Sequence, residues 1–236
     1  MCINPIFERL ALLTGKEGLD KLLKTKVLIF GAGGVGSWTA EALVRSGIGE
    51  IGIIDNDIIN ESNINRQIEA TTLTIGLPKA STLKKRLLEI NPDCKITTWD
   101  ELFCKESADK FKIEKVDYVI DAIDSINHKL DLIEITCNTK AVLFSSMGMA
   151  LKMDPSQIKT ASIWKTDVCP LARHVRQGLR KRLFSKDFIT VYSSEQISNT
   201  EQIHVPGQKT INGSIVTVTA SAGFILASLV INDCLK

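Results

Sequence analysis

Residues 27–57, VLIFGAGGVGSWTAEALVRSGIGEIGIIDND, decide the fold class of this chain. An apolar run is followed by a glycine-rich turn, a helical pattern over about 36–46, and a second apolar run that ends at Asp55. The turn contains Gly31, Gly33, Gly34 and Gly36. Strand, glycine turn, helix and strand in this order are typical of a βαβ unit that binds a nucleotide. We expect backbone N–H groups of the turn to bind a phosphate, and Asp55 to bind a ribose.

Strand and helix patterns continue to alternate beyond this unit. Apolar runs predict further strands within 95–99, 116–124 and 141–148. Helical spacing of apolar residues predicts helices over 77–91, around 106–113 and over 127–138. The alternation indicates an α/β fold, a Rossmann-like, doubly wound and mostly parallel sheet with helices on both faces. In such a sheet, ligands bind at the carboxyl ends of the strands.

The chain has 236 residues, enough for one large domain, and we interpret it as a single domain. Its parts are N-terminal helices (1–25), a nucleotide-binding core (26–150), an insert with a basic helix (151–212) and a C-terminal helix (213–236). Two more strands are expected inside the insert, within 157–164 and 188–195. The C-terminal helix is apolar but interrupted by polar residues. We therefore expect it to be buried or at a subunit interface, with no integral membrane segment.

The composition is that of a soluble globular protein, with 44% hydrophobic and 24% charged residues. A net charge of +2 excludes a general polyanion binder, so any nucleic-acid surface must come from local clustering. The six cysteines are scattered with no CxxC pair, which favours reduced thiols in a cytoplasmic protein and argues against a structural zinc site. No signal peptide is evident at the N-terminus.

Polar residues after Asp55, and at the end of the strand predicted within 116–124, indicate which nucleotide the turn binds. The glycine turn alone fits NAD, FAD, S-adenosylmethionine or ATP. Arginine and lysine neutralise the charge of a triphosphate, an amide can orient it, and a carboxylate at a strand end can hold Mg²⁺. Hydride-transfer domains do not need two cations and an amide at this place. The candidates for ATP and Mg²⁺ are Asp57, Asn63, Arg66, Gln67, Lys79 and Asp124.

Five ordered motifs carry a resemblance that covers nearly the whole chain. They are GAGGVGS, GIIDND, NINRQ, GLPK and VIDAIDS, and together they resemble the adenylating domain of the E1-like superfamily that contains ThiF, MoeB and HesA. The resemblance implies an enzyme that spends ATP to convert a carboxylate into an acyl-adenylate. It implies that the glycine turn faces the phosphates, Asp55 binds the ribose, and Asp124 binds Mg²⁺. The residues that contact or adjoin the triphosphate would be Asn63, Arg66, Gln67 and Lys79.

The N-terminal segment FERLALLTGKEGL adds a catalytic candidate to this set. Arg9 resembles an arginine that reaches into the ATP site of the partner subunit, which implies a homodimer. A surface arginine on a helix is the alternative interpretation. Arg9, Arg66, Lys79 and Asp124 are thus the expected catalytic residues.

Superfamily members differ in the carboxylate that they activate. One branch activates the C-terminal glycine of a ubiquitin-like sulfur-carrier protein, often with two CxxC pairs that this chain lacks. The segments RSGIG, NRQIEA, EINPDC, DPSQI and KTDVCPLARHVRQGLRKR instead resemble the branch that acts on a modified transfer RNA. There the enzyme would adenylate the threonyl carboxylate of N6-threonylcarbamoyladenosine (t6A). The neighbouring carbamoyl group would then attack it and close a ring, so no protein nucleophile is required.

A basic segment supports an RNA substrate independently of the resemblance. Such clusters anchor nucleic-acid phosphates, although a solvated helix face is a common alternative. The expected RNA-binding residues are Lys165, Arg173, Arg176, Arg180, Lys181 and Arg182. The segment departs from the branch pattern at Cys169, where the branch has Asp, and we interpret this thiol as a neutral replacement rather than a reactive group.

The glycine turn is also compatible with different functions. An activator of a sulfur-carrier protein is the nearest of these, and an NAD(P)-binding oxidoreductase or a nucleotide-sensing module is more remote. The resemblance also leaves open a bound monovalent cation and sulfurtransfer or cysteine desulfurase partners.

Overall fold

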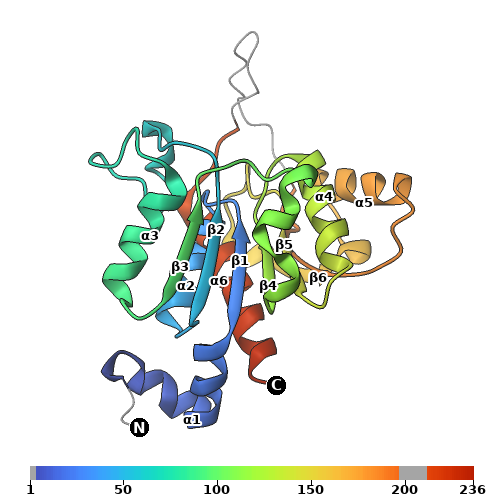
Figure 1. Ribbon diagram of the computed structural model, residues 1–236. Coiled ribbons are helices and arrows are strands. Elements are labelled where there is room, and N and C mark those ends of the chain that lie inside the picture. Colours follow the sequence, from blue (N-terminus) through green and yellow to red (C-terminus); the bar gives the residue numbers. More distant parts are fainter. Residues whose placement is uncertain (1–3, 197–211) are drawn as a thin grey trace.

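The computed structural model describes residues 4–196 and 212–236, and Figure 1 shows them as a sheet covered by helices. The sheet has seven strands in the order β3-β2-β1-β4-β5-β7-β6. All neighbours are parallel except β6 and β7, which pair antiparallel. The strands are β1 (Lys26–Phe30), β2 (Glu50–Ile54), β3 (Lys95–Trp99), β4 (Tyr118–Asp121), β5 (Val142–Ser146), β6 (Ile158–Ser162) and β7 (Ile189–Ser193).

Six α-helices and six short 3-10 helices connect the described strands. The α-helices are α1 (Glu8–Lys24), α2 (Gly36–Arg45), α3 (Lys79–Ile90), α4 (Ile126–Cys137), α5 (Pro170–Lys181) and α6 (Val216–Cys234). The 3-10 helices are η1 (Pro5–Phe7), η2 (Glu61–Asn63), η3 (Lys105–Phe111), η4 (Ile113–Lys115), η5 (Pro155–Gln157) and η6 (Ile163–Lys165). The predicted mostly parallel α/β fold is therefore confirmed.

Alternation along the strands builds two cores, one on each face of the sheet. In β1, Val27 and Ile29 pack in the core that α2, α3 and α6 cover, whereas Leu28 and Phe30 pack in the core that α4, α5 and η3 cover. Successive side chains of a strand point to opposite faces, so a strand buried on both sides has to be apolar throughout. This explains why the runs VLIF and IGII show no polar alternation.

The segment after residue 150 belongs to the same sheet. Strand β7 lies between β5 and β6 and pairs with β5 through Phe144 opposite Ile189, while α5 packs against α4 in the second core. Part of the predicted insert, residues 197–211, lies outside the described residues. The described part extends the sheet by two strands.

Two helical predictions differ from the structure in detail. The predicted helix around 106–113 is instead the pair of 3-10 helices η3 and η4, separated by Lys112 with a left-handed φ of 50°. Helix α1 contains a kink at Gly15, where φ is 70°. The N-terminal helices predicted within 1–25 are thus η1 and one long helix that bends at this glycine.

Helix α6 passes along α2 in the centre of the fold (Figure 1). It is the one described helix that is long and apolar enough to cross a membrane by length and composition alone. Its backbone approaches α2 closely at Gly223, whose carbonyl accepts a hydrogen bond from the Thr39 hydroxyl at 3.1 Å. Val218, Leu226 and Val230 are fully buried in the first core. The helix therefore forms part of the core, as the interrupted apolar pattern predicts.

Candidate nucleotide-binding site

A cavity of about 790 Å³ lies at the carboxyl ends of the parallel strands. Segments that directly follow β1, β2, β3, β4 and β5 form its wall. This is the edge where the strand order reverses between β1 and β4, because consecutive connections there leave on opposite sides of the sheet. Among the predicted site residues, its wall includes Gly31, Gly33, Gly34, Asp55, Asp57, Asn63, Arg66, Gln67, Lys79 and Asp124.

The glycine turn uses its glycines for two different purposes. Gly31 has a φ of 95°, and a side chain there would lie 2.6 Å from the Ala122 carbonyl oxygen. Gly36 is buried, and its Cβ would lie 1.8 Å from the Gly31 carbonyl oxygen. Gly36 therefore lies beneath the cavity rather than on its wall, so its expected contact with phosphate is replaced by a packing role. Gly33 and Gly34 form the part of the turn that is open to a ligand.

Asp55 braces the glycine turn from the end of β2. One carboxylate oxygen accepts a hydrogen bond from the Ala32 N–H at 2.6 Å and the other accepts one from the Asp57 N–H at 2.8 Å. Burial raises the pKa of Asp55, an effect that the nearby Lys79 ammonium partly offsets. Each oxygen retains a lone pair for a further donor, such as a ribose hydroxyl.

Lys79 enters the cavity from the start of α3. Its side chain is 7% exposed, and its Nζ lies 2.8 Å from the Asp57 carboxylate, which is 60% exposed. The Lys79 N–H also donates to the Asp57 carbonyl at 3.0 Å. Asp57 therefore orients the lysine, which is a more specific role than the general nucleotide contact expected from the sequence.

Arg66 also lies on the cavity wall, in the loop that follows η2. Its guanidinium donates to the Ser62 carbonyl at 2.7 Å and to the Asn65 side-chain oxygen at 2.9 Å, and burial lowers its pKa. The neighbouring Asn63 is buried, and its side chain accepts a hydrogen bond from the Asn60 N–H. These contacts hold a planar cation in place before any ligand arrives, which reduces the entropy that binding would cost.

Gln67 and Glu69 are buried polar residues of this loop that lack partners. The side-chain oxygen of Gln67 and both carboxylate oxygens of Glu69 form no hydrogen bond with any described residue. Glu69 is 2% exposed, and burial raises its pKa to about 7, with Lys79 lowering it and Asp55 raising it to smaller extents. Orphaned buried polar atoms are rare in folded proteins, so those beside the cavity are consistent with a polar ligand there.

Asp124 lies on the cavity wall, in the turn that follows β4. Its side chain is exposed on the cavity wall and forms no hydrogen bond or ion pair with the described residues. No described group of three or more His, Cys, Asp or Glu side chains could hold a metal ion unaided. Mg²⁺, however, commonly binds one or two carboxylates together with substrate phosphates. An exposed carboxylate on a cavity wall that also includes Lys79 and Arg66 fits that mode.

Arg9 does not line the cavity of its own chain. It is exposed on α1, which Figure 1 shows at the end of the sheet opposite the carboxyl ends of the strands. The sequence-based assignment of Arg9 to this site therefore requires a second copy of the chain.

Helix α5 carries four of the six predicted RNA-binding residues, while Lys165 ends η6 and Arg182 directly follows α5. Three of the six contact other parts of this chain. Arg176 donates to the Thr166 hydroxyl. The guanidinium carbon of Arg180 lies 5.7 Å from the centre of the Trp164 ring, within cation–π range. These two arginines are therefore held against the body of the protein.

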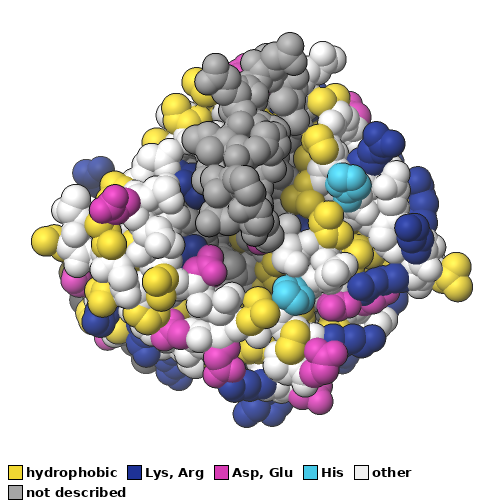
Figure 2. Space-filling view, turned by 90° about the horizontal axis from the view of Figure 1, so that it is seen from above, with side chains coloured by type: hydrophobic (Ala, Val, Ile, Leu, Met, Phe, Trp, Pro, Cys, Tyr) yellow, Lys and Arg dark blue, Asp and Glu magenta, His cyan; other side chains and the backbone are white. Residues whose placement is uncertain are grey.

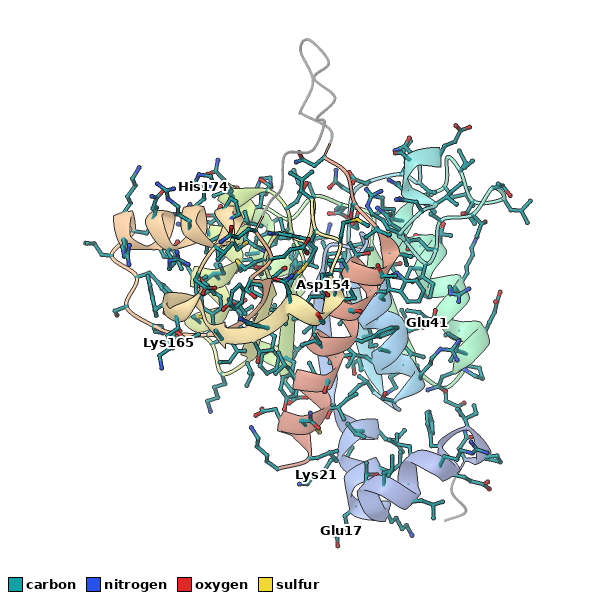
Figure 3. The ribbon with its side chains drawn as sticks, turned by 180° about the vertical axis from the view of Figure 1, so that it is seen from behind. Glu17, Lys21, Glu41, Asp154, Lys165 and His174 are labelled. Atoms are coloured by element: carbon teal, nitrogen blue, oxygen red, sulfur yellow. The ribbon has the colours of Figure 1, made fainter. Side chains whose placement is uncertain are left out.

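Arg182 is the third of these residues to contact another part of the chain. It forms ion pairs with Asp131 and Glu134 at 2.6 and 2.7 Å. The remaining cations are exposed and form no ion pair with the described residues: Lys165, Arg173 and Lys181. Figure 3 shows Lys165 beside α5 and far from Glu17 and Lys21 of α1, and the view from above in Figure 2 shows lysine and arginine side chains along the α5 edge.

Sequence reasoning missed a buried charged group beneath Asp124. Asp121 and Lys129 are both fully buried and form an ion pair at 2.8 Å. Asp121 stands in the quoted motif VIDAIDS, but the partner lysine lies in an apolar helical segment where no motif marks it. The wall formed by Ser146–Ala150 after β5 was also missed, because it contains no charged residue.

The fold and this cavity define a nucleotide-dependent enzyme of the doubly wound α/β class. The chain belongs to the ThiF family, whose profile matches residues 7–235. It is similar to the tRNA threonylcarbamoyladenosine dehydratase of Bacillus subtilis, with 37% identity over 98% of this chain and 94% of that protein.

Solved structures show the same similarity in three dimensions. The dehydratase TcdA of Escherichia coli in complex with AMP superimposes with a TM-score of 0.89 at 31% identity, covering 99% of this chain and 97% of that one. The same enzyme in complex with ATP gives a TM-score of 0.88 at 32% identity, with the same coverage. These relatives span the full length of the chain, which includes both the cavity and α5.

Proposed function

We propose that this protein is an ATP-dependent, tRNA-modifying enzyme that dehydrates N6-threonylcarbamoyladenosine to its cyclic form. The observation that carries the proposal is the full-length similarity to tRNA threonylcarbamoyladenosine dehydratases, including structures with bound AMP and ATP. The cavity supports it, because it gathers two cations, a free carboxylate and an open glycine turn at one edge of the sheet. A cytoplasmic location follows from the substrate class.

The reaction has two steps, adenylation and ring closure, and neither requires a nucleophile from the protein. An oxygen of the threonyl carboxylate attacks the α-phosphorus of ATP, and the bond to the β-phosphate breaks to release pyrophosphate. The carbamoyl group of the same nucleoside then attacks the activated carbonyl, the carbonyl–adenylate bond breaks, AMP leaves and one proton is lost. Because the attacking group is already attached to the substrate, its effective concentration is high.

Electrostatic stabilisation is the contribution of the protein to the first step. Lys79 and Arg66 are the cations that offset the charge developing on the triphosphate, and both are already held by hydrogen bonds. Preorganised charges in a partly buried site act more strongly than the same charges in water. Asp124 would hold Mg²⁺, which neutralises phosphate charge when it is bound. Gly33 and Gly34 offer backbone N–H groups to the phosphates.

Arg9 supports a homodimeric assembly in this proposal. The exposed position of Arg9 on α1 allows it to reach the cavity of a second copy, but not that of its own chain. In that arrangement it would add a third cation to the triphosphate site.

The discriminating experiment is ATP–pyrophosphate exchange with three inputs: tRNA that carries the modified nucleoside, tRNA without it, and a carrier protein that ends in Gly-Gly. We expect exchange with the modified tRNA only. Exchange with the carrier alone would support activation of a sulfur carrier instead. Absence of exchange with every input, combined with NADH binding, would contradict both ATP-dependent functions.

The RNA surface can be tested through the salt dependence of binding. Replacing Arg173 and Lys181 with alanine is expected to weaken tRNA binding and to lower the slope of log K against log salt by about 0.7–0.9 per charge. The control replaces two exposed lysines at the opposite edge of the sheet, Lys85 and Lys95, and removes the same charge. An equal loss of slope in the control would show that the effect is one of net charge, and that α5 is not the RNA surface.

A further inference from the structure

The turn that carries Asp124 is supported from below by a buried polar group. The Asp121 carboxylate accepts hydrogen bonds from the Lys129 ammonium at 2.8 Å, from the Ser145 hydroxyl at 2.6 Å and from the Ile123 N–H at 3.1 Å. Asp121, Lys129 and Ser145 are each fully buried. This group joins the end of β4, the body of α4 and the end of β5 at the edge of the cavity.

The stability of the fold does not by itself explain why a buried ion pair is present here. Removing two opposite charges from water costs free energy that their attraction often fails to recover, and apolar residues of similar volume are often equally stabilising. The surroundings would suit such residues, because Leu130, Leu132 and Ile133 of the same helix belong to the apolar core. A charged pair in this position therefore points to a geometric requirement.

The geometry connects the group to the cavity turn on both sides of Asp124. On one side, Asp121 holds the Ile123 N–H. On the other side, the Lys129 N–H donates to the Ser125 carbonyl at 2.9 Å, as part of the first turn of α4. Residues on both sides of Asp124 are thus hydrogen-bonded to residues of the buried pair, while Asp124 itself is exposed on the cavity wall.

The same turn also packs against the glycine turn. The Ala122 N–H donates to the Phe30 carbonyl at 2.8 Å, and the Ala122 carbonyl occupies the space that a side chain on Gly31 would fill. A displacement of the Asp124 turn would therefore alter the phosphate-binding loop. Mg²⁺ requires near-ideal octahedral coordination, so a carboxylate that would hold it beside a phosphate has to be placed accurately.

We propose that Asp121, Lys129 and Ser145 are positioning residues that fix the turn bearing Asp124, and so set the affinity of the nucleotide-loaded site for its divalent ion. This inference rests on the proposed function, in which Asp124 binds Mg²⁺ beside ATP. None of the three residues touches the nucleotide. They act through the backbone of residues 122–125.

The test measures divalent-ion dependence separately from catalysis. Binding of a fluorescent ATP analogue is titrated with Mg²⁺ in wild-type protein and in the Lys129→Met and Ser145→Ala variants, and unfolding by urea is recorded for each. Loss of residues that orient a metal ligand commonly weakens metal affinity 10- to 100-fold, so we expect the Mg²⁺ half-saturation to rise by about 10-fold or more. Binding of the analogue without Mg²⁺ is expected to change little.

Leu132→Ala is the matched control, because Leu132 is fully buried in α4 but takes no part in the polar group. It is expected to lower stability and to leave the Mg²⁺ half-saturation unchanged. Ser145→Ala removes one hydroxyl only, so the test stands even if Lys129→Met fails to fold. Half-saturation within twofold of wild type in Ser145→Ala, or a shift in Leu132→Ala of the same size, would overturn the positioning role. Wild-type protein that binds the analogue independently of Mg²⁺ would instead overturn the metal assignment, and this inference with it.

Discussion

Asp124→Ala is expected to lower ATP–pyrophosphate exchange by about 100- to 1,000-fold, the range seen when one preorganised electrostatic group is removed from a site. Asp124 lines the same cavity as Lys79 and Arg66, and its side chain forms no hydrogen bond or ion pair with the described residues. The loss would therefore arise from the divalent ion and not from the fold. Exchange is measured with modified tRNA over a range of Mg²⁺ concentrations.

Stability supplies the control for this variant. An exposed side chain without partners contributes little to the free energy of unfolding, so Asp124→Ala should unfold within about 0.5 kcal/mol of wild type. Glu89→Ala, which removes an exposed acid from α3, should leave both exchange and stability unchanged. Normal Mg²⁺-dependent exchange in Asp124→Ala would show that the ion is held elsewhere.

Glu69→Gln is expected to stabilise the protein by about 3 kcal/mol at pH 8, which is the effect of moving a carboxyl pKa from 4.5 to about 7. Burial is the main cause of that shift, which the backbone N–H of Glu69, Lys79 and Ser37 offset in part. Between pH 4.5 and 7 the folded chain retains a proton that the unfolded chain has released. The wild-type free energy of unfolding therefore falls as pH rises through this window. Glutamine imitates the protonated carboxyl and removes the fall.

Urea unfolding at pH 4.5 and pH 8 measures this difference. The two proteins should be similar at the lower pH, where the carboxyl is protonated in the folded state, and should diverge at the higher one. Glu89→Gln is the control, because its exposed side chain should give no pH-dependent difference. Equal stability of Glu69→Gln and wild type at both pH values would contradict the buried, unpartnered state of Glu69.

Most of the nucleotide site could be predicted from the sequence, because its parts are short segments next to strand ends. Asp55 and Asp124 directly follow apolar runs, and parallel strands bring their carboxyl ends to one edge. A local pattern is therefore sufficient to place both on the cavity. The local pattern did not predict that Gly36 lies beneath the cavity. The turn folds back so that Gly36 packs against the Gly31 carbonyl, and the pattern of glycines does not reveal this contact.

The basic segment shows what residue types alone do not reveal about the partners of charged side chains. Six cations within eighteen residues suggested one RNA-binding face, yet Arg176, Arg180 and Arg182 contact Thr166, Trp164 and two acids of α4. Those partners lie up to 51 residues away in the chain. Charge patterning could not separate the cations that have partners within the chain from those that do not, because it does not report which side chains meet.

The sequence by itself determined the class of sheet, the glycine turn and most of the charged residues that line the cavity, because strand periodicity and turn chemistry are properties of neighbouring residues. Only the tertiary structure decided which side chains are partnered. Asp57 orients Lys79, Asp121 meets Lys129 beneath the Asp124 turn, and Glu69 is buried without an ion-pair partner among the described residues. Burial and pairing depend on elements that are distant in the chain, and burial and pairing set the pKa of a carboxyl and the position of a ligand.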